Sequence, residues 1–400
     1  MRHLTTKYSL IMAFYWSIAA VLGNYASVYL LGQGFKNTQI GLIIATTALL
    51  SAIVQPLIGT YADKPHSPSV KIILIVIVAF FLVFAILIPL FSERSLLILT
   101  VVYAIALVLM QIMPPLINSL GTISIYEGYN VNFGIARGIG SLVFAIVSLI
   151  IGSAISHRGI FLIPLVSICL CVFYVISLIA FPFEKTVVPV SKTIQRGFLK
   201  KYPSYVIVLI AAIFLYISHG LINNFAFQII TSKGGDSESL GVAFAIAAVM
   251  ELPLMFFFSR LLRKFTAGQW LIISGFAYVV KGICTLLVTS VVGFYCAQML
   301  QILSYAVITV ASVYFINDIM KPEDTVKGQT FFTMTNMIGS VFASAFGGWL
   351  LDVRGVSALL VVAICLAIAG ALVMWYGVKK SKKDADCTKL VSVEEETNVQ

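Results

Sequence analysis

The chain has 400 residues, of which 60% are hydrophobic and 10% are charged, and its mean hydropathy is +1.02. Soluble domains contain roughly 45–50% apolar and about 25% charged residues, so this composition excludes an ordinary soluble protein and indicates a membrane protein. The formal net charge is +10. An anionic membrane leaflet attracts such a surplus, so nucleic-acid binding is not needed to explain it.

Apolar runs of about 20 residues, the length that crosses a bilayer as a helix, recur along the whole chain. Lipid offers the backbone no hydrogen-bond partners, so these runs predict helices rather than the shorter, alternating strands of a barrel. The first run is too long for the apolar core of a signal peptide, so we expect it to be retained. In chain order, the twelve predicted spans are 8–32, 38–61, 70–91, 95–118, 134–155, 160–182, 204–230, 239–259, 269–289, 292–317, 329–351 and 356–378.

The positive charges indicate how these spans are oriented. If the N-terminus is cytoplasmic, twenty Lys and Arg residues fall on the cytoplasmic side and five fall outside, while Lys281 lies within a span. This asymmetry is the positive-inside pattern of membrane proteins. It predicts a multi-pass protein of the cell (cytoplasmic) membrane with both termini in the cytoplasm.

A repeat divides the spans into two sets of six. The polar, basic segment 183–203 lies between them and is typical of a cytoplasmic linker. A shift of 200 residues aligns the run from Gly41 with the run from Gly241, and IGSLVFA from Ile139 corresponds to IGSVFA from Ile338. The sequence therefore predicts an all-α integral membrane protein built by duplication, with twelve transmembrane helices in two pseudo-symmetric six-helix bundles. The expected boundaries are 1–182, the linker 183–203, 204–378 and a disordered cytoplasmic tail, 379–400.

The segment GTYADK (59–64) resembles the gating loop of the major facilitator superfamily, whose pattern is G-x-x-x-D-R/K. Gly59, Asp63 and Lys64 stand at the positions of that pattern, although the full basic ending is missing. The resemblance implies that these residues form a latch between helices in one closed state. A plain turn with cytoplasmic lysines is the alternative.

Further segments resemble particular branches of that superfamily, and together they cover nearly all twelve spans. NFGIARGIGSLVF (132–144) is similar to the start of the fifth helix in the lactose permease group. Segments 25–43, 218–227 and 250–264 resemble the phenylpropionate permease and nucleoside symporter branch. The resemblance implies a fold of two parallel halves with a solute site between them near the midplane, and transport by alternating access.

Two charged residues lie deep inside predicted spans. Glu251 is near the middle of span 239–259, and Lys281 is at a comparable depth in span 269–289. A charge at mid-bilayer costs about 2.5–3.5 kcal/mol on insertion scales, so such residues indicate function and need partners. We expect the two to pair and to take part in proton coupling, since burial raises the pKa of a carboxyl group and a nearby cation lowers it. The alternative is an ion pair that only joins two helices.

A polar face is predicted on span 204–230, where His219 is followed at helical spacing by Asn223. A His here also agrees with the phenylpropionate branch, so we expect it to contact protons or solute, with hydrogen-bonded packing as the alternative. In the first span, Asn24 and Tyr25 are candidates for the wall of a solute cavity, although aromatic residues in membrane helices are more often packing residues.

The similarity to lactose permease implies that Arg137 binds solute, together with an aromatic residue seven positions later, here Phe144. Asn118 stands where that permease carries an acidic partner. On the tenth span, Gln301 and Ser304 stand where the permease has ionisable groups. Glu251 is then the remaining carboxylate deep in a span, because three aspartates lie at or beyond the span ends, namely Asp63, Asp318 and Asp352.

Other chemistry has little support. The six cysteines have neither disulfide nor zinc spacing, and a phosphate-binding Gly-rich loop and a nucleophile–base set are missing, so we expect no metal, no cofactor and no enzyme activity. We predict a monomeric secondary active transporter for a small polar solute, coupled to protons by symport. Candidate solutes are a sugar or short oligosaccharide, a nucleoside, or an aromatic acid. The alternatives are an efflux carrier for drugs or metabolites and a non-transporting sensor or scaffold.

Overall fold

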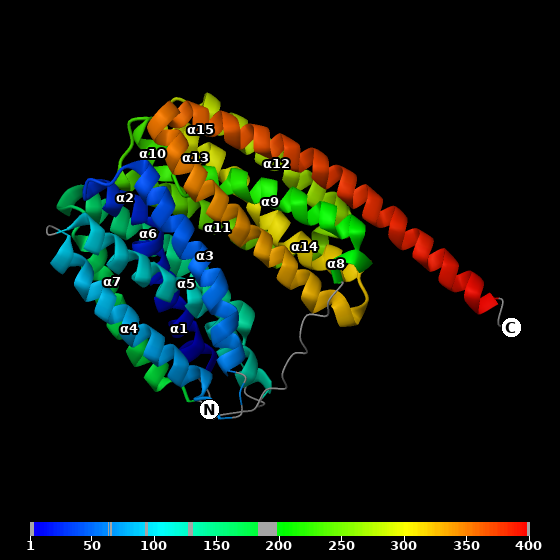
Figure 1. Cartoon of the computed structure of the whole chain (residues 1–400), viewed down its shortest axis with the longest axis horizontal. Helices are drawn as coiled ribbons and strands as arrows, with labels where there is room; N and C mark the ends of the chain where they lie inside the picture. Colours follow the sequence, from blue (N-terminus) through cyan, green and yellow to red (C-terminus); the bar gives the residue numbers. More distant parts are fainter. Residues whose placement is uncertain are drawn as a thin grey trace. The chain divides into compact units, whose positions relative to one another are not determined.

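The computed structural model describes residues 4–62, 64, 66–92, 95–126, 131–182 and 198–397, and every regular element in these ranges is helical (Figure 1). Three segments make up the first span: α1 (Leu4–Ile18), the π-helical η1 (Ala19–Asn24) and α2 (Ala26–Gly32). The remaining helices of the N-terminal part are α3 (Asn37–Ala62), α4 (Val70–Phe91), α5 (Leu96–Tyr126), α6 (Phe133–Arg158) and α7 (Leu162–Ala180).

The C-terminal part contains α8 (Phe198–Lys201), α9 (Pro203–Asn223), α10 (Ala226–Thr231), α11 (Ser237–Leu261), α12 (Ala267–Leu287), α13 (Val291–Met299), the 3₁₀ turn η2 (Leu300–Ile302), α14 (Tyr305–Ile319) and α15 (Pro322–Thr397). Within the described ranges, ten helical segments are long and apolar enough to cross a membrane, and the bent pair α1–η1 and α2 is an eleventh. One of the ten contains two predicted spans, since α15 is kinked at Gly355, where φ is 74°. The all-α fold and the predicted spans are therefore confirmed.

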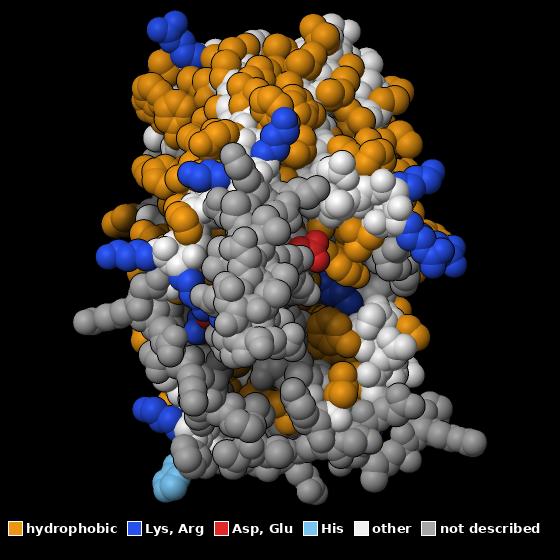
Figure 2. All heavy atoms as spheres, turned by 90° about the vertical axis from the view of Figure 1, so that its right-hand side faces the viewer, with side chains coloured by type: hydrophobic (Ala, Val, Ile, Leu, Met, Phe, Trp, Pro, Cys, Tyr) orange, Lys and Arg blue, Asp and Glu red, His pale blue; other side chains and the backbone are white. Residues whose placement is uncertain are grey.

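The outer faces of these helices are apolar. Large side chains such as Phe80, Ile150 and Ile179 are more than half exposed, and hydrophobic side chains cover much of the surface in Figure 2. Monomeric soluble proteins rarely expose so much apolar area to water, whereas surfaces that face lipid are apolar. The exposure pattern therefore agrees with a chain that is surrounded by a bilayer.

The chain forms two compact units. The first contains Met1–Ser191, Asn224–Leu252 and Ser344–Val356, and the second contains Lys192–Asn223, Pro253–Ala343 and Ser357–Gln400. The halves that the sequence predicted, 1–182 and 204–378, are contiguous, whereas α10 and parts of α11 and α15 here belong to the first unit. Most of the predicted linker, 183–197, lies outside the described residues. Helix α15 continues to Thr397, where the sequence predicted a disordered tail from residue 379.

The backbone repeats itself at offsets equal or close to the 200 residues that the sequence predicted. Helices break at Tyr25 in the first span and at Asn224 and Phe225 in the seventh. Two pairs of glycines adopt positive φ at matching places, Gly34 with Gly234 and Gly159 with Gly355. Such backbone favours glycine, because a Cβ atom would clash there. These matches in local structure support the internal duplication.

In the first unit, glycines bring two helix pairs into backbone contact. A Cβ atom on Gly41 of α3 would lie 2.1 Å from the Ser344 carbonyl oxygen of α15, and one on Gly348 would lie 2.3 Å from the Asn37 carbonyl oxygen. A Cβ atom on Gly241 of α11 would likewise lie 2.3 Å from the Ser148 carbonyl oxygen of α6. We call the α3–α15 contact seam A and the α6–α11 contact seam B.

The two seams correspond under the repeat. Gly41 of seam A aligns with Gly241 of seam B at the shift of 200 residues. Ser344 and Gly348 of α15 make the same contacts with α3 as Ser148 and Gly152 of α6, 196 residues earlier, make with α11. Each seam thus joins a helix of the N-terminal half to a helix of the C-terminal half. Small residues permit this approach in membrane helices, where association depends on close packing.

Side-chain hydrogen bonds reinforce the seams differently. The Tyr25 hydroxyl, which is fully buried, donates to the Ser148 carbonyl oxygen at 2.9 Å and lies 3.4 Å from that of Ser237, so it joins α6 to α11 at seam B. At seam A, the Asn224 amide donates to the Ser344 hydroxyl at 2.8 Å. The duplicated chain therefore keeps the backbone geometry of the two seams but not their side-chain contacts.

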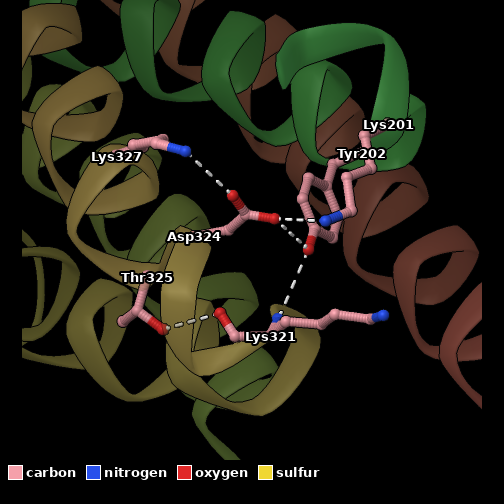
Figure 3. A network of polar contacts seen from close by, with 6 residues as sticks. All are labelled: Lys201, Tyr202, Lys321, Asp324, Thr325 and Lys327. Carbon is pink, nitrogen blue, oxygen red and sulfur yellow. Dashed lines mark hydrogen bonds and ion pairs between the residues drawn. The ribbon is translucent and has the colours of Figure 1, made fainter. Parts of the chain in front are cut away.

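In the second unit, a buried carboxylate joins the segment before α9 to the first turn of α15 (Figure 3). Asp324 accepts hydrogen bonds from Lys201 Nζ at 2.5 Å, the Tyr202 hydroxyl at 3.0 Å and Lys327 Nζ at 3.3 Å. The Tyr202 oxygen also accepts from the Lys321 amide at 3.3 Å. The hydrogen bond from Lys201 lowers the pKa of Asp324, and the same bond raises the pKa of Lys201.

These shifts predict how pH affects stability. The lowered pKa of Asp324 gives stability that is present above about pH 4, the ordinary range of an Asp, and is lost as pH falls through the folded-state value. The raised pKa of Lys201 gives stability that is present below about pH 10 and is lost as pH rises further. We expect Asp324→Asn to lower the Tm by a few degrees at pH 7 and to weaken its dependence on acid, as measured by thermal unfolding in detergent. Lys321→Gln is the control, because only the backbone of Lys321 takes part. An Asp324→Asn protein with the wild-type Tm across the pH range would contradict the assignment.

Candidate functional site

An aromatic and cationic cluster lies between α1 and α6 in the first unit. The Arg137 guanidinium lies over the Trp16 ring, with its central carbon 4.2 Å from the ring centroid. Arg137 Nη1 also donates a hydrogen bond to the Ser141 hydroxyl at 2.7 Å. Both the indole and the guanidinium are half-buried. The Trp16 ring and the Ser141 hydroxyl therefore both help to orient the guanidinium, which is a planar fork of five N–H donors.

The sequence of α6 makes room for this indole. Gly140 lies one helical turn after Arg137, and a Cβ atom there would lie 2.7 Å from Trp16 Cδ1. Phe144, one further turn along, meets the indole edge to face with ring centroids 6.2 Å apart. The adjacent Tyr15 also makes an edge contact, at 5.3 Å. The groove over Arg137, Gly140 and Phe144 thus fixes Trp16 against one face of α6.

The predicted residues Arg137 and Phe144 are therefore brought together, and Trp16 lies between them. Trp16 is not among the candidates that the sequence analysis above names. The signal that would have found it is the glycine at the third position after Arg137, which marks a place where a large partner packs. The Trp16 indole N–H has no hydrogen-bond partner in the described part of the chain, so it is available to a ligand.

The other N-terminal candidates are dispersed. Asn118 is exposed on α5, and its carbonyl oxygen accepts the Thr122 hydroxyl. Asn24 ends η1 and is half-buried, with no side-chain hydrogen bond to any described residue. Tyr25 is buried and uses its hydroxyl in seam B. Thus the Tyr25 hydroxyl has a structural partner, whereas neither polar atom of the Asn24 side chain is hydrogen-bonded to a described residue.

A second cluster lies in the second unit. His219 of α9 stacks on Tyr305 of α14, with ring centroids 4.6 Å apart, and meets Tyr278 of α12 edge to face at 6.0 Å. Lys281 of α12, which is only 2% exposed, donates a hydrogen bond to Gln301 Oε1. The structure thus groups His219, Lys281 and Gln301, three of the predicted residues, within one unit.

A break in the tenth span presents Gln301. Helix α13 tightens into the 3₁₀ turn η2, and Ser304 leaves helical geometry with φ −90° and ψ −87° before α14 begins. The Ser304 carbonyl oxygen accepts from the Ile308 amide at 3.2 Å and from the Ser274 hydroxyl at 2.7 Å, so α12 is hydrogen-bonded to the start of α14. Interrupted helices at mid-membrane are common at transporter sites. One turn before, Gln298 is 1% exposed and neither of its amide atoms has a partner in the described residues.

The repeat relates the two clusters. Tyr216 of α9 aligns with Trp16, and Gly339 of α15 aligns with Gly140. A Cβ atom on Gly339 would lie 2.6 Å from Tyr216 Cβ, so an aromatic residue packs on a glycine in both units. The position of Arg137 is taken by Asn336, which the Tyr216 hydroxyl approaches. One copy of the motif is therefore cationic and the other neutral.

The remaining predicted residues have separate places. Glu251 belongs to the first unit and Lys281 to the second, so their pairing stays a prediction. Asn223 is half-buried at the end of α9. Gly59 lies inside α3 and Lys64 is exposed after it, whereas Asp63 lies outside the described residues. Among the described residues, no group of three or more His, Cys, Asp or Glu could hold a metal ion.

Comparisons with known proteins identify the family. The profile of the MFS_1-like family matches residues 5–362. Maltose permease of Geobacillus stearothermophilus is 25% identical over 364 residues, which cover 89% of this chain and 90% of that protein. The crystal structure of the nucleoside transporter NupG superposes with a TM-score of 0.79 at 13% identity, covering 96% of this chain and 100% of the other. A bacterial homologue of the human lysosomal transporter Spinster, in an inward-facing and unoccupied conformation, gives 0.69 at 13% identity, with coverages of 96% and 98%.

The similarity to the two solved structures shows a shared fold, and the family profile spans most of the sequence. Those relatives are transporters and not enzymes. The chain belongs to the MFS_1-like family of the major facilitator superfamily, and it is a multi-pass membrane transporter.

Proposed function

We propose that this transporter imports a small polar organic solute across the cytoplasmic membrane by proton symport, and that the solute is a sugar or short oligosaccharide. The single observation that carries the solute class is the Arg137–Trp16 pair on α6 and α1. A sugar ring has hydroxyl groups around its rim and an apolar C–H face. A planar guanidinium beside an indole suits both features, since the first donates several hydrogen bonds and the second offers flat apolar area.

Two further considerations support this ranking. Maltose permease is a relative at 25% identity, and its name gives a sugar as its solute. The fold is also shared with a nucleoside transporter, and a nucleoside likewise combines a hydroxyl-bearing sugar with a flat ring. Arg137 and Lys281 are two cations in the two clusters, which keeps an aromatic acid as the third candidate. A nucleoside ranks second because an indole also stacks on a base.

Proton coupling is assigned to Glu251, with Lys281 and His219 as further members. Glu251 is half-buried in α11, two residues before the helix-internal Pro253. A carboxylate in such a place exchanges its proton when its surroundings change between hydrated and dry. Lys281 donates a hydrogen bond to the neutral amide of Gln301, beside the break in the tenth span. The predicted orientation, with both termini in the cytoplasm, follows the positive-inside rule.

Trp16→Ala is expected to raise the Kd and half-saturation concentration of the solute about tenfold or more, because stacking and the orientation of Arg137 are both lost. Trp16→Phe should retain part of the affinity. The solute is first found by thermal-shift screening of purified protein against sugars, nucleosides and aromatic acids, since binding to the folded state raises the Tm. Trp375→Ala is the matched control, because this exposed indole lies under Lys379, far along α15. Equal affinity in Trp16→Ala and wild type would refute the site, and stabilisation by aromatic acids alone would refute the sugar assignment.

Glu251→Gln is expected to abolish uphill, proton-driven uptake in proteoliposomes while exchange of labelled for unlabelled solute persists. The amide keeps the size of the carboxyl group but cannot exchange a proton. Glu238→Gln on the same helix is the control, because Glu238 is exposed at its first turn. Undiminished accumulation by Glu251→Gln would remove this residue from coupling. Accumulation in everted rather than right-side-out vesicles would replace import by efflux.

A further inference from the structure

Seam A is closed by one carboxylate that caps a helix of the other half. Asp352 Oδ1 accepts hydrogen bonds from the Asn37 amide N–H at 3.2 Å and from its side-chain Nδ2 at 2.9 Å. Asp352 Oδ2 accepts from the Thr38 amide N–H at 2.7 Å and from its hydroxyl at 2.6 Å. These donors belong to the first two residues of α3, where backbone N–H groups have no partner inside the helix. The positive end of the helix dipole also lies there and favours a negative charge.

The equivalent position in seam B carries no charge. Ser156 of α6 aligns with Asp352, and its hydroxyl accepts from the Glu238 amide N–H at 3.2 Å while it donates to Asp236 Oδ2 at 2.6 Å. Asp236 lies on the same side of the seam as the helix it caps, since it also accepts from the Ser239 amide and hydroxyl at 3.0 Å. Burial alone would raise the pKa of Asp236, but the hydrogen bonds from Ser156 and Ser239 lower it. Only one hydrogen bond to this carboxylate therefore crosses seam B.

Hydrogen bonds alone compensate the charge of Asp352. The charged residues on the elements packed around it are Lys36, before α3, and Arg354, two residues further along α15, and both are exposed. Neither forms an ion pair with any described residue. From α10, the neutral Gln228 contributes a hydrogen bond to Asn37 at 3.0 Å, and the turn that follows α10 carries Lys233 and Asp236. A proton on Asp352 would thus remove the charge that α3 stabilises, and its O–H donor would face the donors of Asn37 and Thr38 instead of accepting from them.

We propose that Asp352 is a proton-binding site that controls the opening of seam A. A proton from the adjacent aqueous side binds one carboxylate oxygen, the hydrogen bonds across the seam are lost, and α15 separates from α3. When the seam closes again, the proton returns to the same side. The site therefore moves no proton across the membrane, so it regulates the conformational cycle without contributing to the stoichiometry of symport. On the orientation that the charges predict, this side is the cell exterior, and acid outside favours the open seam.

The test measures the width of seam A directly and needs no solute. Spin labels are attached to cysteines at Leu42 of α3 and Val353 of α15, both about half exposed, in a full-length protein whose native cysteines are replaced. Pulsed electron spin resonance then gives the distance distribution in liposomes from about pH 7.5 to about pH 2.5, because a carboxyl group released from the seam binds protons only near and below the ordinary Asp pKa of about 4. We expect a short distance at neutral pH and a growing population at longer distance in acid. The ratio of the open to the closed population changes by up to about tenfold for each unit by which the pKa of Asp352 differs between the two states.

Variants separate this site from other titrating groups. Asp352→Asn should show the longer distance at neutral pH and lose most of the pH response. Thr38→Val, which removes one hydroxyl donor, should keep the response but shift its midpoint upward by about half a pH unit or more, because fewer hydrogen bonds favour the charged form. Ser156→Ala, the equivalent position in seam B, should keep the wild-type midpoint.

The outcomes decide between a proton site and a purely structural cap. A distance distribution in the wild type that is unchanged down to about pH 2.5 overturns the proposal. So does an unshifted midpoint in Thr38→Val, which decides the question even if Asp352→Asn does not fold. Solute binding and Glu251 take no part in this measurement, so its failure would leave the proposed transport function standing.

Discussion

The close approach of backbones at the two seams is the constraint on which the first unit depends. At Gly41, Gly152, Gly241 and Gly348, a single Cβ atom would fall within 2.1–2.6 Å of a carbonyl oxygen on the facing helix. Two helices with no side chain between them form a close backbone contact that small displacements disrupt, because protein interiors are densely packed. Such a contact is either formed or lost. Hydrogen bonds placed beside such a contact therefore act on a two-state element rather than on a gradually yielding one.

The same duplication that produced matching seams also produced unequal ones. Seam B carries the buried Tyr25 hydroxyl, whereas its counterpart Phe225 has none to offer at seam A. Seam A carries the charged Asp352, whereas seam B carries the neutral Ser156 at that position. The aromatic cluster diverged in the same manner, with Arg137 beside Trp16 in one half and Asn336 beside Tyr216 in the other. A symmetric frame with different side chains is what a carrier needs if its two halves move alike but recognise an asymmetric solute.

Much of the fold could be predicted from sequence because lipid imposes simple rules. Apolar runs of about 20 residues must be helices, so the spans followed from hydropathy alone. The repeat was visible because glycines cannot be exchanged where a helix touches another backbone or φ is positive, as at Gly34 and Gly234. The proximity of Arg137 and Phe144 followed from their helical spacing, and the resemblance to sugar permeases indicated a role for them.

Contacts between distant segments were harder to predict. Trp16 reaches Arg137 only because α1 packs against α6 at Gly140, which spacing within one helix does not reveal. The hydrogen bond from Lys281 to Gln301 was not predicted either, because a 3₁₀ turn in another helix presents the amide. Asp352 was set aside because it lies at the end of a span. Its four donors belong to residues more than 300 positions earlier, and no local pattern connects them.

The π-helical turn η1 separates the cluster of Trp16 and Arg137 from seam B within one continuous span. Trp16 precedes Ala19–Asn24, and Tyr25 follows it. A π-turn contains one residue more than an α-turn, so conversion of this turn to regular α-helix would rotate Tyr25 relative to Trp16 by about 100° and shift it by about 1.5 Å along the axis. The hydroxyl that joins α6 to α11 would then leave its carbonyl acceptors. The first span thus contains one extra residue between the Trp16 ring, which packs on Arg137, and the Tyr25 ring, which joins two helices. Loss of the π-turn would rotate one ring relative to the other over fewer than ten residues.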